Sequence, residues 1–349
     1  MRNETRTWSV LWPGEDGRSL IILDSAALPH EVRTLRLETV AEVAEAIRLG
    51  RLRGALASAL AAAFGLAFAL RARPVDAAIA AARSLLTGAA GGAAPRVVLD
   101  RVVRRVAPLA EGERFAAAWD EAHALLGEKA AADAAVGRAG RAVIARLAER
   151  RGDGPVRVLA VGDADLVLPA LQVSAQAGLP LHVWCTQAEP GFEAMGIASS
   201  LIGGAAVGRL MQQGQVDLVL AGADAVAANG DLSATAGTYL TALAAGDNGV
   251  PFYVVVHRLL VDATTADGGG LPFDEGDPRE VLEVVGRAPD GRVQPVRVAS
   301  DSARAVSLHG DLTPVRLVSA YLTDVGALLP DEPIGQRLSP AMPERASRT

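Results

Sequence analysis

Apolar residues in the second half of the chain fall in short, nearly continuous runs. Such runs are typical of strands that are covered on both faces of a parallel sheet. Helical patterns lie between them, and this alternation of strand and helix predicts a doubly wound, Rossmann-like α/β sheet. The strands are expected at residues 156–162, 179–185, 216–220 and 250–256.

The first half shows a different, mainly helical pattern. A short strand-rich start is followed by apolar residues at helical spacing, and Thr39 is in place as a helix N-cap. Residues 85–96 are rich in glycine and are expected to be flexible. The elements expected here are strands within 8–23 and helices at 39–70, 75–86, 95–106 and 111–151.

These two patterns predict a division into two domains. Residues 1–128 are expected to form a smaller, mainly helical domain with a small β element, and residues 129–349 a Rossmann-like domain. The helix at 111–151 is expected to be interrupted near Gly127 and Gly137, and its part at 129–152 to link the domains. A chain of 349 residues, half of them hydrophobic, is long enough for both.

Composition narrows the classes of partner. The net charge of -6 argues against nucleic-acid binding, because phosphate neutralisation needs clustered cations. The longest apolar run, residues 55–70, falls short of a bilayer span and is expected to be a buried helix. No apolar core of signal-peptide type follows the first residues. We therefore expect a cytoplasmic protein that binds a small molecule and neither nucleic acid nor membrane.

Cysteine, histidine and lysine usage limits the chemistry further. Cys185 is the only cysteine, which excludes an internal disulfide and suits a reducing compartment. The five histidines lack metal-ligand spacing, so a zinc site is not expected. No other cofactor is expected either. Lys129 is the only lysine, so none is available in the second half to act as a base or to bind a phosphate.

Asp224 is the carboxylate whose position most needs an explanation. The strand expected at 216–220 leads through Gly222 to this residue, which places it at the carboxyl edge of the sheet, where open α/β sheets bind ligands. The alternative is that Asp224 only caps the following turn. Asn229, Gly230 and Asp231 then form a tight turn of their own.

Around these residues the sequence resembles a known family. GADAVAANGD, GTY and VPFYVVV, which lie between residues 222 and 256, are similar to segments of the methylthioribose-1-phosphate isomerase family. That family is related to ribose-1,5-bisphosphate isomerases and to the regulatory subunits of the eukaryotic initiation-factor exchange complex. Collinear blocks at 22–32, 39–70, 271–281 and 307–328 extend the resemblance along most of the chain.

The resemblance implies aldose–ketose isomerisation of a ring-opened sugar phosphate by a homodimer. In the family an aspartate and a cysteine flank the reacting carbons. The aspartate corresponds to Asp224, whereas the cysteine position corresponds to Gly162 within one residue. Asp163 and Asp165 could replace the thiol as acid or base, or could cap the next helix. Cys185 could carry a displaced thiol, or could simply be buried.

The family's substrate-binding positions are only partly retained. The Asn–Lys pair after the ANGD motif is replaced by Ala234 and Thr235. The arginine of the RGA motif is present as Arg53, which could bind a phosphate or extend along the surface. A second arginine of the family corresponds to Ala94, and Arg96, two residues later, could reach the same space. The residues expected to bind substrate are Arg53, Gly54, Ala55, Arg96, Asn229, Gly230 and Asp231.

Three hypotheses for function follow. The first is a divergent isomerase-like enzyme that acts on a sugar or sugar-phosphate-like substrate through Asp224 and a substitute partner. The second is a non-catalytic relative that binds a ligand or another subunit. The third is the same fold with different chemistry in a specialised pathway. The retained Asp224 block favours the enzymes, and the lost cysteine and lysine favour the second and third hypotheses.

Overall fold

The order of the strands in the central sheet determines where a ligand can bind. The computed structural model describes residues 9–90, 92–187, 190–273 and 275–338. Six parallel strands stand in the order β6-β5-β4-β7-β10-β17, which is 3-2-1-4-5-6 in chain order, and antiparallel β18 closes one edge. The strands are β4 (Val156–Val161), β5 (Leu181–Cys185), β6 (Ser199–Leu201), β7 (Leu218–Gly222), β10 (Phe252–Val255), β17 (Ala320–Thr323) and β18 (Gly326–Leu328).

The expected α/β fold with a parallel sheet is confirmed, and its strands are buried as their composition implies. Each of the four predicted runs overlaps a strand, and every residue of β7 is buried. The strand order reverses between β4 and β7, so the chain leaves these two neighbouring strands in opposite directions. Such a reversal opens a crevice at the carboxyl ends of the strands.

Two smaller sheets position segments around the central one. The first is a four-stranded sheet of order β11-β8-β9-β16, and its strand β8 begins directly after Asp224. The backbone N–H of Asp224 donates to the carbonyl of Ser233 (2.8 Å). The second is the expected small β element near the start, the antiparallel sheet β1-β2-β3. Trp8 lies outside the described residues. The strands are β8 (Ala225–Ala227), β9 (Leu232–Thr235), β11 (Val261–Asp262), β16 (Gly310–Thr313), β1 (Leu11–Pro13), β2 (Leu20–Leu23) and β3 (Thr34–Leu37).

Helices dominate the rest of the first half, as predicted. Thr39 caps α1 in a capping box, because its hydroxyl accepts from the Glu42 N–H and the Glu42 carboxylate accepts from the Thr39 N–H. Helix α2 is apolar and long enough to cross a membrane by composition, but 83% of it is buried inside the protein, as a core helix. The helices are α1 (Val40–Arg48), α2 (Ala55–Ala72), α3 (Asp76–Ala90) and α4 (Ala94–Val106).

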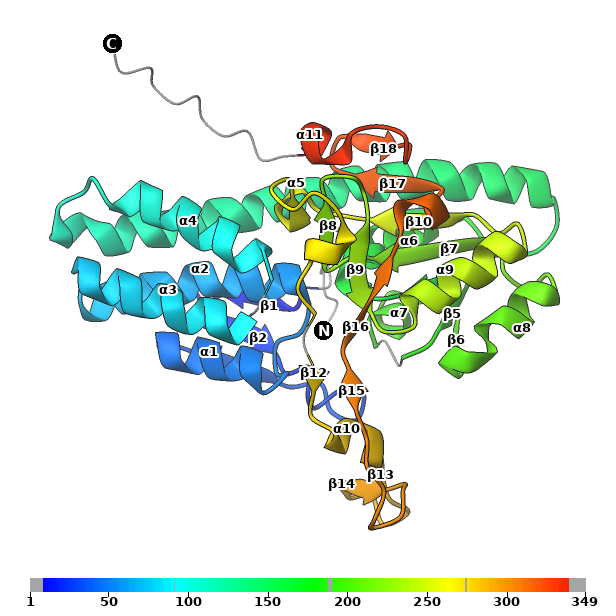
Figure 1. The fold of residues 1–349 in the computed structure, drawn as a ribbon, viewed down its shortest axis with the longest axis horizontal. Helices are drawn as coiled ribbons and strands as arrows, with labels where there is room; N and C mark the ends of the chain where they lie inside the picture. Colours follow the sequence, from blue (N-terminus) through cyan, green and yellow to red (C-terminus); the bar gives the residue numbers. More distant parts are fainter. Residues whose placement is uncertain (1–8, 91, 188–189, 274, 339–349) are drawn as a thin grey trace.

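The glycine-rich stretch at 85–96 is mostly helical rather than flexible as expected. Helix α3 continues through it to Ala90 and α4 begins at Ala94; Gly91, between them, lies outside the described residues. The hairpin β13-β14 projects from the body of the molecule (Figure 1). The remaining elements are α6 (Ala164–Gln176), α7 (Pro190–Ala194), α8 (Val207–Gln212), α9 (Thr238–Asp247), α10 (Arg279–Leu282), α11 (Ile334–Leu338), β12 (Glu275–Gly276), β13 (Glu283–Arg287), β14 (Val293–Arg297) and β15 (Ser307–Leu308).

Helix α5 (Glu111–Arg151) is continuous over 41 residues, so the expected interruption near Gly127 and Gly137 is wrong. Gly137 and Gly140 instead allow close packing on α6: a β-carbon at Gly140 would lie 2.3 Å from that of Ala170. The helix runs along the length of the molecule and packs on α2 and α4 as well as on α6 (Figure 1). The domain boundary expected at 128/129 falls inside this helix and stays a prediction.

The glycines of α5 allow a paired test of this packing. Gly140→Leu should destabilise the protein by about 1–3 kcal/mol, because the side chain must force α5 and α6 apart. Gly127 is exposed and has no atom within 4 Å of a β-carbon, so Gly127→Ala should stabilise by about 0.5–1 kcal/mol through helix propensity alone. Urea unfolding of both variants checks the two signs, and equal effects would contradict the packing role of Gly140.

Candidate active site

A cavity of about 720 Å³ lies at the carboxyl ends of β4, β5 and β7, where the strand order reverses. Both halves of the chain contribute to its walls, with polar groups concentrated at the strand ends. The polar and glycine residues of the lining are Ser25, Arg53, Gly54, Gly162, Asp163, Asp165, Cys185, Thr186, Gln187, Gly204, Asp224, Thr235, Gly237, Thr238 and Thr241.

Two glycines bring the ends of β4 and β7 into direct backbone contact. Gly162 has φ +76, and a β-carbon there would lie 2.5 Å from the carbonyl oxygen of Gly222. A β-carbon on Gly222 would in turn lie 2.4 Å from the carbonyl oxygen of Asp163. No side chain therefore fits between the two strands at this level. Asp163 directly follows Gly162, Asp224 lies two residues after Gly222, and both line the cavity.

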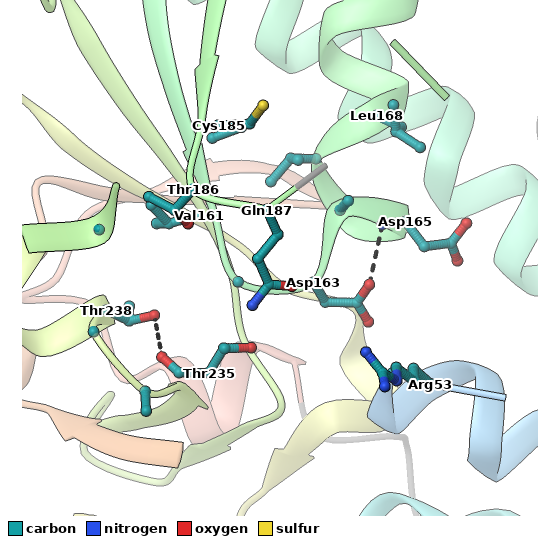
Figure 2. A pocket seen from close by; sticks show the side chains of 18 of the residues that line it. Arg53, Val161, Asp163, Asp165, Leu168, Cys185, Thr186, Gln187, Thr235 and Thr238 are labelled. Carbon is teal, nitrogen blue, oxygen red and sulfur yellow. Dashed lines mark hydrogen bonds between the residues drawn. The ribbon is translucent and has the colours of Figure 1, made fainter. Parts of the chain in front are cut away.

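Asp163 is both a helix cap and a cavity residue. Its Oδ1 accepts from the Asp165 N–H (3.0 Å) at the start of α6, so the capping alternative is confirmed. Its carboxylate also faces the guanidinium of Arg53 (Figure 2), and a β-carbon on Gly54 would lie 2.5 Å from Oδ2. Burial, with the charges of Asp165 and Asp224, raises the pKa of Asp163 to about 8.

Asp224 is held differently from Asp163. Within the described part of the chain its carboxylate accepts no hydrogen bond, so a capping role finds no support. Burial alone raises its pKa to about 6. At neutral pH Asp224 is therefore mostly ionised while Asp163 is mostly protonated. Two carboxyl groups whose surroundings separate their pKa values are typical of an acid and base pair.

The other two candidates for the lost thiol point elsewhere. Cys185 is buried at the end of β5, its Sγ lies 3.6 Å from the carbonyl of Ser200, and its side chain points away from Asp163 (Figure 2). The carboxylate of Asp165 also points away from that of Asp163 (Figure 2). It accepts from Lys129 Nζ at 3.0 Å.

Lys129 is the functional candidate that the sequence analysis missed. It lies on α5, its side chain is 13% exposed, and it pairs with Asp133 (2.7 Å) as well as with Asp165. The ion pair with a residue of the cavity lining brings the charge of this lysine close to the site. In the sequence, Lys129 stands out only as the one lysine among 34 lysines and arginines.

The residues expected to bind substrate are only partly brought together. Arg53 and Gly54 line the cavity, and Arg53 Nε donates to the carbonyl of Gly50 (3.2 Å). Ala55 begins α2 behind them and does not line it. Arg96 is exposed on α4, donates to the carbonyl of Gly92 (3.1 Å), and also lies outside the lining.

Asn229, Gly230 and Asp231 lie in the turn between β8 and β9, outside the cavity lining. The Asp231 carboxylate accepts from the backbone N–H of Val315 (2.9 Å), and the Gly230 carbonyl accepts from the Tyr321 hydroxyl. This turn therefore holds the C-terminal segment in place. Its contact with substrate stays a prediction that the geometry does not support.

Threonines supply most of the remaining polar lining. Thr235 and Thr238 face the cavity, and the Thr238 hydroxyl donates to the carbonyl of Thr235 (2.7 Å; Figure 2). Thr235 stands where the resemblance implies a lysine, so the family's cation is absent from this wall. Among the described residues there is no group of three or more histidines, cysteines, aspartates and glutamates arranged to hold a metal.

The fold and the cavity define an α/β protein with a small-molecule site at the switch point of a doubly wound sheet. Residues 51–330 match the model of the initiation factor 2 subunit family. The chain is 35% identical to the methylthioribose-1-phosphate isomerase of Brucella anthropi, over 99% of this chain and 100% of that protein. It is 36% identical to that of Rhizobium meliloti, with the same coverage. The chain therefore belongs to the initiation factor 2 subunit family. Within that family, its full-length relatives named here are methylthioribose-1-phosphate isomerases.

Solved structures agree on the fold. A 5-methylthioribose 1-phosphate isomerase from Pyrococcus horikoshii superposes with a TM-score of 0.75 at 24% identity, over 96% of both chains. The delta subunit of translation initiation factor eIF-2B from A. fulgidus gives 0.72 at 22% identity, over 93% of this chain and 97% of that one. The family expected from the sequence is confirmed.

Restoring the family's thiol at Gly162 should fail for a structural reason. Gly162→Cys must adopt a positive φ and push against the Gly222 carbonyl, which should cost about 1–3 kcal/mol of stability. Gly203→Cys, at an open position with φ -62, is the matched control and should leave the melting temperature nearly unchanged. Thermal melts check both; a Gly162→Cys protein as stable as the wild type would contradict the described backbone contact.

Proposed function

We propose that this protein is an isomerase acting on a sugar phosphate, which it converts from aldose to ketose in the cavity at the switch point. The observation that carries the proposal is that Asp163 and Asp224, which follow neighbouring strands, both line this cavity, where burial raises the pKa of each carboxyl group. The full-length similarity to methylthioribose-1-phosphate isomerases supports it.

The pair suits the proton transfers of such a reaction. An aldose 1-phosphate becomes a ketose 1-phosphate when the bond between C1 and the ring oxygen breaks, a hydrogen moves from C2 to C1, the C2 hydroxyl loses a proton and the ring oxygen gains one. Asp224, ionised near neutral pH, accepts a proton, and Asp163, protonated in the same range, donates one. In this proposal a carboxyl group takes the place of the thiol that the family uses.

Arg53 is the group we assign to the substrate's phosphate, because it is the cation within the described lining of the cavity. The N-terminus of α9, which also faces the cavity, is already occupied: the N–H groups of Gly237 and Tyr239 donate to the Asp311 carboxylate (2.6 and 3.0 Å). The threonine hydroxyls of the lining are left to contact the sugar.

Two further parts of the proposal concern the state of the protein in the cell. We propose that it acts in the cytoplasm and that it forms a homodimer. The dimer stays a prediction from the family resemblance. The non-catalytic alternative finds no specific support in the cavity, where a scaffold would have no use for two carboxyl groups with separated pKa values.

Asp224→Asn tests the catalytic assignment. The change keeps the size of the side chain but removes proton transfer, so activity should fall about 10²–10⁴-fold. Because the carboxylate accepts no hydrogen bond within the described residues, the melting temperature should stay nearly unchanged. The assay is conversion of a panel of aldose 1-phosphates, beginning with methylthioribose 1-phosphate. Full activity combined with a lowered melting temperature would reject the assignment.

The pH dependence follows from the two raised pKa values. Activity should fall below about pH 6, where Asp224 takes up a proton, and again above about pH 8, where Asp163 loses one. The kcat/KM profile should thus be bell-shaped, with its maximum between these limits. Circular dichroism at each pH separates this from unfolding. A rate that keeps rising above pH 9 in a folded protein would show that Asp163 is not the acid.

A further inference from the structure

The single lysine of the chain lies within a partly buried ion-pair network behind the cavity wall. Lys129 Nζ lies 2.7 Å from Asp133 and 3.0 Å from Asp165, and the side chains of Lys129 and Asp165 are 13% and 10% exposed. Asp133 is on the same helix, α5, whereas Asp165 is in the first turn of α6. The pair therefore ties the long helix to the turn that follows β4.

A hydrogen bond connects this network to the cavity residue Asp163. The backbone N–H of Asp165, the residue that Lys129 holds, donates to Asp163 Oδ1 at 3.0 Å (Figure 2). Any displacement of the first turn of α6 therefore moves the Asp163 carboxyl group. The contact between Gly54 and Asp163 Oδ2 leaves little room for such a displacement on the other side.

We infer that Lys129 is a positioning residue: through its ion pair with Asp165 it fixes the location and the proton affinity of the Asp163 carboxyl group. This inference rests on the proposed function in treating Asp163 as the acid. A lysine suits the place because its compact ammonium can sit between two buried carboxylates, whereas the wide planar guanidinium of arginine demands a different geometry.

The charged groups around Asp163 determine the direction of the effect. Asp165 and Asp224 raise its pKa, and the positive charge of Lys129 lowers it. Arg53 faces it from the start of α2 (Figure 2). His257, which follows β10 and also senses Lys129, has a pKa lowered to about 4 by burial, so it stays neutral in the relevant range. Removing the charge of Lys129 should make Asp163 hold its proton more tightly.

Two variants should therefore move the alkaline limb of the kcat/KM profile in opposite directions. Lys129→Met should shift it upward by about one pH unit, because a positive charge is lost near Asp163. Asp165→Asn should shift it downward, because a negative charge is lost. A merely structural network would lower the melting temperature of both variants and leave the limb in place, and that result would overturn the inference.

Arg101→Met is the matched control for loss of a helix-to-helix ion pair. Arg101 on α4 pairs with Glu121 and Glu128 of α5 and does not line the cavity. This variant should lose stability and keep the pH profile of the wild type. A shifted limb in Arg101→Met would mean that general loosening, and not the charge of Lys129, moves the profile, which would also overturn the inference.

A second measurement needs neither a variant of Lys129 nor any activity. Because Lys129 is the only lysine, labelling with ¹⁵N-lysine gives a single side-chain ammonium signal. Its chemical shift should titrate with the pKa of Asp163, and Asp163→Asn should remove that inflection. A shift that is flat from pH 6 to 9 would overturn the inference. If the inflection is present but no aldose phosphate is converted, the proposed function fails and the network stands.

Discussion

The direct backbone contact between Gly162 and Gly222 is the constraint on which the rest of the site depends. Neighbouring parallel strands normally separate where the chain leaves the sheet, but here β4 and β7 remain in contact beyond their last hydrogen-bonded residues. The two carboxyl groups that follow are consequently held in one cavity wall. Burial raises the pKa of both groups, which is why we propose them as the acid and the base.

The same contact leaves no room for a side chain at Gly162, the position that corresponds to the family's cysteine within one residue. We therefore propose that the carboxyl group of the next residue, Asp163, acts at this strand end. The position and charge of the Asp163 carboxyl group must be controlled by its surroundings, because a carboxyl group whose pKa is raised toward neutral pH responds to every nearby charge. The residues at the start of α2 lie against this carboxyl group on one side, and the ion pair of Lys129 and Asp165 holds the turn of α6 on the other.

Much of the fold could be predicted because its causes are local. The apolar runs gave the strands, and Thr39 with Glu42 gave the start of α1. The glycines of α5 were misread because glycine has a low helix propensity. Close packing on α6 favours glycine here, but Ala170, the residue that Gly140 packs on, lies 30 residues away in the sequence, so no local pattern shows the contact. Asp224 was expected at the cavity because strand ends meet at one edge of the sheet, and Arg53 because it matches the family's RGA motif; both line the cavity. Lys129 was missed because no local pattern connects it to Asp165. The turn at Asn229 was predicted as a turn, but its hydrogen bonds with Val315 and Tyr321 could not be, because those residues come from distant segments.

A crystal structure with a bound, non-reactive analogue of a ribose 1-phosphate would show whether the cavity at the switch point is the active site. We expect the phosphate on Arg53 and the reacting carbons of the sugar between the carboxyl groups of Asp163 and Asp224. Crystals of Asp224→Asn should bind the analogue in the same place, because binding does not need proton transfer. An analogue bound at the turn of Asn229 to Asp231, or anywhere outside this cavity, would show that the active site lies elsewhere.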